Sequence, residues 1–87
     1  MQEQNLTVSD GELKLRRAFA RALQVSEEGV NETLQYASTP GWDSVAHMAL
    51  IATLDSAFDI MLDTDDVLDL SSYPKAREIL RKYGVQF

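Results

Sequence analysis

Cysteine is missing from this chain, and its 87 residues include one histidine and two prolines. Without cysteine there is no disulfide framework, no thiolate nucleophile and no zinc site built on sulfur. The single histidine, His47, excludes most metal sites and most serine–histidine catalytic machinery. If the protein takes part in thiol chemistry, the thiol must therefore come from a prosthetic group.

Long apolar runs are also missing. No run approaches the roughly 18 apolar residues that a membrane-spanning helix needs. Residues 1–5 are polar and lack the basic start and apolar stretch of a secretion signal. The length leaves room for one modest core. We therefore expect a single domain over residues 1–87, an ordered core at about residues 9–84 after a frayed lead-in at residues 1–8, no membrane contact and a cytoplasmic location.

Lysine and arginine are absent from the centre of the chain. Residues 22–74 hold ten acidic residues and no basic one, and the whole chain has a net charge of −6. The eight basic residues lie on either side: Lys14, Arg16, Arg17, Arg21, Lys75, Arg77, Arg81 and Lys82. Such a centre repels phosphates, so we expect no nucleic-acid partner. It is either ordinary solubilising charge or a surface that attracts basic proteins.

What is present is helical periodicity. A first helix is predicted from the Ser9-x-x-Glu12 capping box to about Val25. Its apolar stripe consists of Leu15, Ala18, Phe19, Ala22 and Leu23. Residues 26–42 are rich in turn formers and predict a loop that is unusually long for so small a domain. Four residues are expected to hold this loop against the core: Val30, Leu34, Tyr36 and Trp42.

The second helix is predicted to begin at Asp43 or Ser44 and to run to about Asp59. At 100° per residue, its side chains separate into two faces. The core-facing positions are His47, Leu50, Ile51, Leu54 and Phe58, followed by Met61. The other face begins at the serine and mixes small apolar groups with acids: Ser44, Val45, Met48, Ala52, Asp55 and Asp59. This second face is either a binding surface or a broader buried one.

A short third helix follows, capped by Asp63 or Thr64. Its apolar anchors are Val67, Leu68 and Leu70. The last helix begins after Ser72, with Pro74 in the first turn where a missing N–H is tolerated, and ends at Gly84. Its inward residues are Ala76, Ile79, Leu80 and Tyr83. The sequence predicts an all-α fold, a small four-helix bundle with a long loop between the first two helices and a short third helix.

Ser44 and His47 are three residues apart on the predicted second helix, so the pair must be weighed as a catalytic one. A serine hydrolase needs a base on the serine, a group that orients the base and an oxyanion hole. The chain has no G-x-S-x-G elbow, and His47 falls on the core-facing stripe. We expect no catalytic residue here, and we expect His47 to be partly buried and hydrogen-bonded locally.

Five aspartates gather at the end of the second helix and along the third: Asp59, Asp63, Asp65, Asp66 and Asp69. The residue order of a calcium loop and its terminal glutamate are missing. We expect no dedicated metal site, and we expect these acids to cap the short helix and face solvent.

A serine that opens a helix suits another role. Helix N-termini carry unpaired N–H groups and a partial positive charge, which favour an anion. A phosphate attached to the hydroxyl of Ser44 would be well tolerated there. Asp-Ser also occurs at helix starts for structural reasons alone, so the dipeptide by itself leaves both interpretations open.

The pattern of the whole chain resembles the acyl carrier protein family. The family hallmark is Asp-Ser-Leu at the start of the second helix, and it reads Asp43-Ser44-Val45 here. Downstream, Leu50-Ile51-Ala52-Thr53-Leu54 is followed by Phe58-Asp59-Ile60, and Tyr73-Pro74-Lys75-Ala76 is similar to the family's start of the last helix. The resemblance covers about residues 9–84.

The resemblance implies a carrier and not an enzyme. It implies that a phosphopantetheinyl transferase esterifies Ser44, beside Asp43, with 4′-phosphopantetheine from coenzyme A. The thiol of this arm then carries acyl or aminoacyl groups as thioesters to loading and transferring enzymes with basic docking surfaces. Apolar contact to those partners is expected from Val45, Met48 and Ala52, and electrostatic steering from Asp55 and Asp59. We expect the carrier to be a monomer.

The chain departs from the family pattern in two ways. Val45 stands where leucine is usual, and three positions that are often acidic in fatty-acid carriers are neutral: Ala46, Ala49 and Ser56. The partners are therefore expected to differ from those of fatty-acid synthesis, and the chain is similar to stand-alone carriers of specialised pathways. An aminoacyl or peptidyl carrier of the same fold and an unmodified acidic interaction module remain the alternatives.

Overall fold

The computed structural model describes residues 9–87. In this range the regular structure consists of four α-helices and one 3-10 helix: α1 (Asp10–Leu23), η2 (Glu27–Gly29), α2 (Ser44–Phe58), α3 (Thr64–Asp69) and α4 (Tyr73–Lys82). The described residues form no strand, only an isolated antiparallel bridge between Gln35 and Ser72. The predicted all-α fold is confirmed, whereas the predicted lead-in at residues 1–8 lies outside the described residues.

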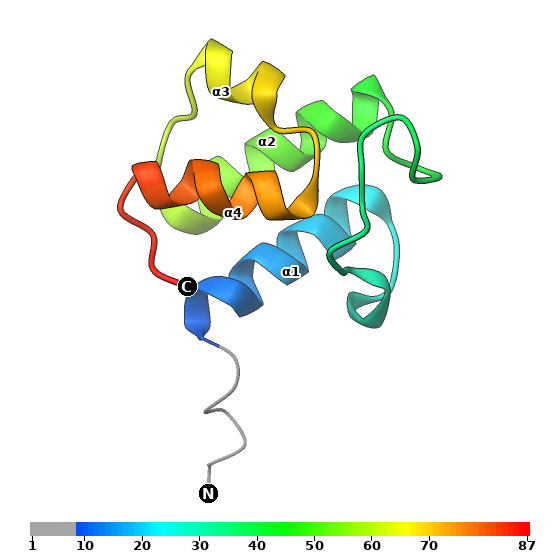
Figure 1. Cartoon of the computed structure of the whole chain (residues 1–87), viewed down its shortest axis with the longest axis horizontal. Helices are drawn as coiled ribbons and strands as arrows, with labels where there is room; N and C mark the ends of the chain where they lie inside the picture. Colours follow the sequence, from blue (N-terminus) through cyan, green and yellow to red (C-terminus); the bar gives the residue numbers. More distant parts are fainter. Residues whose placement is uncertain (1–8) are drawn as a thin grey trace, which may run out of the picture.

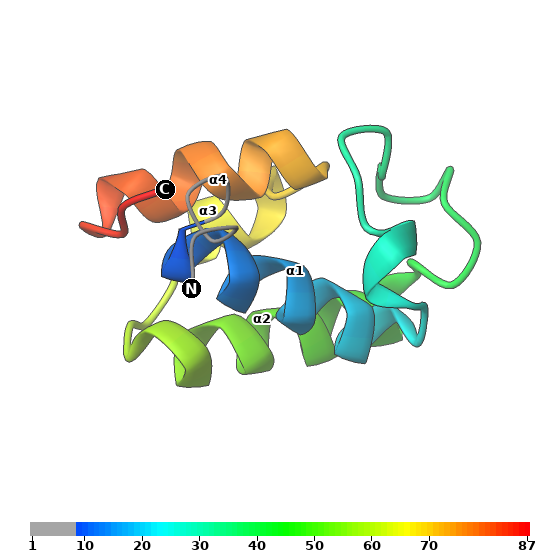
Figure 2. The same cartoon turned by 90° about the horizontal axis from the view of Figure 1, so that it is seen from below.

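The helices form a small bundle with the long loop at one end. Helices α1 and α2 pack along each other, and α4 lies across them (Figures 1 and 2). The short helix α3 lies beyond α2 and α4, on the side away from α1 (Figure 1). The loop between α1 and α2 covers the end of the bundle where α1 ends and α2 begins.

Each α-helix begins at a side chain that accepts a hydrogen bond from the N–H three residues later. These caps are Ser9, Asp43, Asp63 and Ser72. Helix α1 ends earlier than predicted because Gln24 adopts the left-handed conformation at φ 59°. Helix α2 ends in the same way at Asp59, with φ 55°. Short polar side chains therefore set where the helices start, and single left-handed residues set where α1 and α2 end.

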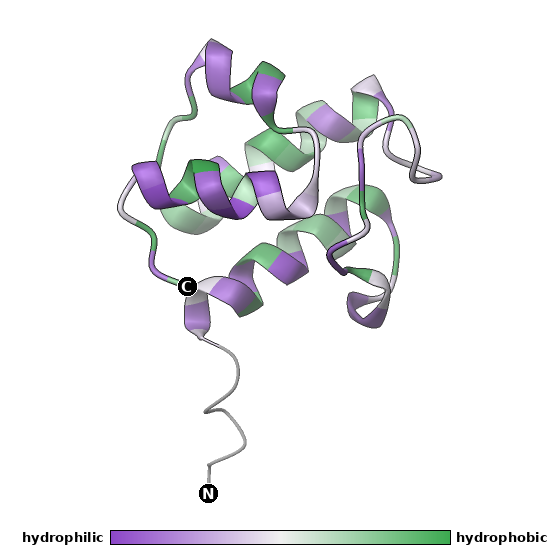
Figure 3. Cartoon of the chain, viewed as in Figure 1, coloured by the Kyte–Doolittle hydropathy of each residue, from purple (hydrophilic) through white to green (hydrophobic). Residues whose placement is uncertain are grey.

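The core lies between the helices and beneath the loop. Figure 3 shows apolar residues, in green, alternating with polar ones along each helix. At its centre, the ring of Phe19 packs edge-on against both Trp42 and Tyr73, with centroid distances of 5.3 and 5.0 Å. Val30, Leu34 and Trp42 are buried and hold the loop in place, as predicted. Tyr36 instead remains 40% exposed.

Two predicted core residues lie on the surface. Met61 is 83% exposed and Leu68 is 78% exposed. The apolar stripe of α2 does not continue to Met61 because the left-handed Asp59 turns the chain away. Leu62 is buried instead, and its N–H donates to Oδ1 of Asp55 at 3.1 Å.

A polar network joins α1, the loop and α4. The Tyr73 hydroxyl donates to Glu12 Oε2 at 2.6 Å, and the Arg77 guanidinium bonds both Glu12 and Glu32. Burial opposes the ionisation of Glu12, but the bonds from Tyr73 and Arg77 hold its pKa below the ordinary value. Burial, and then the bond to Glu12, raises the pKa of Tyr73. Glu12 therefore links α1 to α4. Of the predicted capping box the structure shows the bond from the Glu12 N–H to Oγ of Ser9, while the Glu12 carboxylate is bonded to α4 instead.

Candidate functional site

Ser44 is the first residue of α2 and is exposed. The preceding residues explain its position: Gly41 has φ 90°, Trp42 is buried, and the chain emerges at Asp43. The carboxylate of Asp43 turns into the helix and accepts from the N–H of Ala46 at 2.9 Å. Among the described residues, no group hydrogen-bonds the hydroxyl of Ser44. Ser44 therefore lies exposed at the first turn of α2, where the N–H of Ala46 is bonded to Asp43 and those of Ser44 and Val45 have no acceptor within the helix.

His47 is turned away from the serine. The indole N–H of Trp42 donates to Nδ1 of His47 at 3.0 Å. Because an indole nitrogen only donates, Nδ1 accepts, and Nε2 carries the proton that it donates to the carbonyl of Val67 at 2.8 Å. Both ring nitrogens are thus engaged, and neither serves as a base for Ser44. The expectation of a partly buried, hydrogen-bonded His47 is confirmed, although one bond reaches across the fold to α3.

Aromatic packing holds this histidine on two sides. Its ring lies at 22° to that of Trp42, with centroids 6.0 Å apart, and Tyr36 packs against it at 5.4 Å. The loop, α2 and α3 therefore meet at one imidazole ring. The sequence indicated that Trp42 anchors the loop, but it gave no signal for the link to Val67, which is 20 residues away along the chain.

The predicted partner face is only partly a free surface. Val45 and Met48 are 78% and 61% exposed. Asp59 is exposed, but Asp55 is half-buried, and its Oδ1 is occupied by the N–H of Leu62. Ala52 is exposed and borders a hollow that Arg21 also lines. Val45, Met48 and Ala52 are thus exposed along α2 with Ser44, and Asp59 is exposed at the opposite end, as the residue that caps the helix. Asp55 also holds the backbone after the helix through its bond with Leu62.

A small apolar cleft borders His47, and Ser44 is not part of its lining. It measures about 170 Å³ and runs between the loop, α2 and α3. Its lining consists of Tyr36, His47, Val67, Leu68, Leu70 and Ser71. Of these, the sequence had placed only His47 near the serine. The others come together through the tertiary fold, so no local pattern indicated them.

One aspartate of the cluster at the end of α2 and along α3 is buried. The expectation that its acids face solvent is wrong for Asp66, which is 5% exposed. Its carboxylate accepts from Lys82 at 2.6 Å and from the Tyr83 hydroxyl at 2.7 Å. The bond from Lys82, followed by that from Tyr83, lowers the pKa of Asp66. A carboxylate can be buried here because α4 supplies a cation and a hydroxyl to satisfy it.

Within residues 9–87, no three histidine, aspartate or glutamate side chains gather as a metal-binding group. The same residues contain no helix long and apolar enough to cross a membrane. Comparison of the chain with models of protein families, with curated protein sequences and with solved structures gave no match. The function must therefore be argued from the site itself.

Proposed function

We propose that this chain is an acyl carrier protein whose Ser44 bears a 4′-phosphopantetheine arm. The observation that supports this most is the position of Ser44: an exposed hydroxyl on the first residue of α2, with no base directed at it. A hydroxyl without a base is a poor nucleophile by itself. It is, however, open to an enzyme that brings its own base.

The surroundings of Ser44 fit a phosphodiester. The first turn of α2 offers N–H groups that have no acceptor within the helix, and the helix dipole favours an anion there. The nearest acid, Asp43, points its carboxylate at the N–H of Ala46. The attached arm would supply a thiol, which this cysteine-free chain lacks.

The exposed face next to Ser44 would meet the partners. Val45 and Met48 offer apolar contact, and a methionine side chain adapts to different surfaces. Asp59 would steer basic groups of the phosphopantetheinyl transferase and of the acyl-loading enzymes. Single exposed ion pairs contribute about 0.2–1 kcal/mol, so these encounters would be brief and sensitive to salt. We place the carrier in the cytoplasm, as a monomer.

The cleft that His47 borders would hold only a short part of a cargo chain. Its volume of about 170 Å³ is below the roughly 300–1,000 Å³ of pockets that enclose a drug-sized ligand. A longer chain would require α3 to move. The cargo is therefore proposed as an acyl group without a finer assignment, and an aminoacyl cargo on the same arm is the alternative.

The test is modification by a promiscuous phosphopantetheinyl transferase with coenzyme A, followed by intact mass. The wild-type chain should gain one phosphopantetheine group, and Ser44→Ala should gain none. Ser56→Ala, an exposed serine later on α2, serves as the matched control and should be modified at the wild-type rate. Modification that survives in Ser44→Ala would refute the assignment. No mass gain in the folded wild type would leave an unmodified interaction module as the better description.

A further inference from the structure

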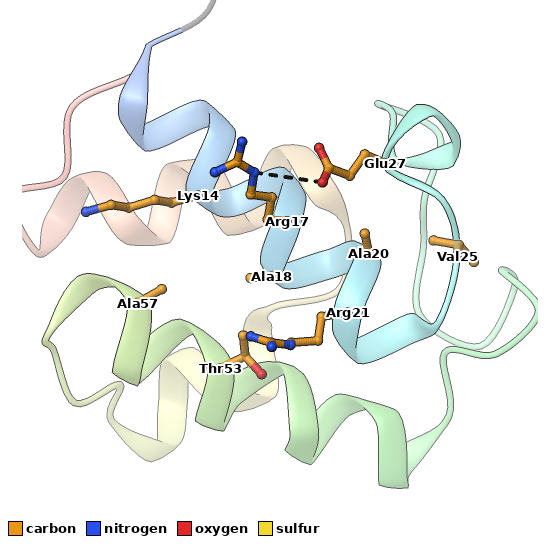
Figure 4. Close-up of a pocket in the computed structure, with 9 residues that line it drawn as sticks. All are labelled: Lys14, Arg17, Ala18, Ala20, Arg21, Val25, Glu27, Thr53 and Ala57. Carbon is orange, nitrogen blue, oxygen red and sulfur yellow. Dashed lines mark ion pairs between the residues drawn. The ribbon is translucent and has the colours of Figure 1, made fainter.

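A groove separate from the Ser44 site runs between α1 and α2. Its volume is about 670 Å³ and it is open to solvent. Ala18 of α1 and Thr53 and Ala57 of α2 lie along it (Figure 4). These side chains are small, so they leave a hollow where larger ones would fill the space between two helices. Ser44 is not part of its lining.

Three cations line the α1 side of this groove. Lys14, Arg17 and Arg21 are spaced three and four residues apart, which places them along one edge of the helix. Figure 4 shows Arg21 extending from α1 towards Thr53. The one acid in the lining is Glu27, so these four charges sum to +2, in a chain whose net charge is −6. The groove is thus positively charged on a protein whose net charge is negative.

The contacts that these cations make inside the protein are weak. Arg17 is paired with Glu27 at 3.8 Å, and both side chains are more than half exposed, at 65% and 52%. Lys14 lies 5.9 Å from the centroid of the Phe58 ring. Exposed pairs at this distance are readily exchanged for others. The cations therefore stay available to carboxylates of another molecule.

We infer that this α1–α2 groove binds an acidic, amphipathic segment of a partner protein. Carboxylates of the segment would meet Lys14, Arg17 and Arg21, and its apolar side chains would lie on the floor formed by Ala18 and Ala57. This combination is the helix-in-groove mode of recognition, with charge setting the register. A partner held there leaves Ser44 exposed, and the inference does not depend on whether Ser44 is modified.

The same features disfavour a nucleic acid. The groove lining contains no aromatic side chain on which a base could stack. A long polyanion would also extend over the acidic residues of the rest of the chain. A short segment that alternates carboxylates and apolar side chains avoids both difficulties.

The experiment measures fluorescence anisotropy with the full chain at low salt. The probe is a fluorescein-labelled synthetic helical peptide with glutamate on one side and leucine and alanine on the other. Arg17→Glu with Arg21→Glu should raise its Kd at least about tenfold. Arg81→Glu, which reverses an exposed cation on α4 outside the groove, should change it less than about twofold. A peptide with lysine in place of glutamate should not bind.

A second variant tests the shape of the groove without changing charge. Ala57→Met fills the floor and should weaken peptide binding by about tenfold, with the helical circular dichroism signal retained. If the charge reversals unfold the chain, peptide binding by Ala57→Met still tests whether the groove is the binding site. The inference would be overturned if Arg81→Glu raised the Kd as much as Arg17→Glu with Arg21→Glu does. Unchanged peptide binding in Ala57→Met would also overturn it.

Two further outcomes would also overturn it. A single-stranded oligonucleotide that binds as tightly as the acidic peptide would show a general polyanion patch. Self-association in sedimentation that Arg17→Glu with Arg21→Glu abolishes would show that the occupant is the acidic face of a second copy.

Discussion

The indole N–H of Trp42 donates a hydrogen bond to Nδ1 of His47, with 3.0 Å between the two nitrogens, and the two rings lie nearly parallel. Trp42 is 1% exposed, so this bond satisfies a buried donor. It also fixes the histidine as the tautomer whose Nε2–H caps the carbonyl of Val67 in α3. Trp42, a residue of the loop, thereby selects the tautomer of His47 that can bond α2 to α3.

Replacing the histidine should loosen α3. His47→Ala leaves the Trp42 N–H buried without a partner, which costs about 1–3 kcal/mol, and frees the Val67 carbonyl. The urea midpoint should fall, and amide hydrogen exchange should accelerate in Thr64–Asp69 more than in Asp10–Leu23. A uniform change in both helices would contradict a specific link between His47 and α3.

A side chain at Gly41 should lower the stability of the fold. Its φ of 90° is strained for other residues, and an added Cβ would lie 3.2 Å from the carbonyl oxygen of Leu23. Gly41→Ala should lower the free energy of unfolding by about 1–3 kcal/mol, measured by urea denaturation. Gly29→Ala is the control, because a Cβ there meets only ordinary contacts at 3.5 Å or more. Equal stability of the two variants would show that the turn before Ser44 can relax.

The two aspartates of the partner face should behave differently. Asp55→Asn keeps an oxygen that can accept from Leu62, whereas Asp55→Ala loses it and should cost about 0.5–1.5 kcal/mol. Asp59→Asn removes an exposed charge and keeps a short polar side chain that suits the left-handed conformation at φ 55°. It should therefore slow modification by the transferase at low salt with little effect on stability. A rate unchanged in Asp59→Asn would count against acidic docking at this residue.

Stability should be highest at intermediate pH. Glu12 and Asp66 have lowered pKa values in the folded chain, so the unfolded chain takes up protons first as the pH falls. Their contribution is complete above about pH 5 and is lost as the pH drops through the folded pKa values. A bond to Asp66 raises the pKa of Lys82, and burial raises that of Tyr73. Those contributions are complete below about pH 10 and are lost as the pH rises further.

Urea midpoints measured across the pH range check this profile. Asp66→Asn and Glu12→Gln should each make the loss of stability at low pH less steep, because one linked proton has been removed. If the urea midpoint falls equally steeply at low pH in the wild type and in both variants, other carboxylates cause the loss of stability.

Helix starts were readable from the sequence, while the end of α1 and several core positions were not. Ser9, Asp43, Asp63 and Ser72 cap the helices because a short polar side chain reaches its own backbone, a contact within three residues. The exposure of Met61 was not predicted, because it depends on a left-handed residue at Asp59. Nothing in the local pattern required a non-glycine residue to adopt that conformation.

The sequence by itself determined the helical class, the long loop and the place of Ser44 at the start of α2, because periodicity and capping are local. Only the tertiary structure decided that His47 is held by Trp42 and Val67, that Asp66 is buried against Lys82, and that Arg17 and Arg21 border a groove. These features join residues from different elements. Burial and partner choice at such positions depend on how the helices pack, which no stretch of sequence specifies alone.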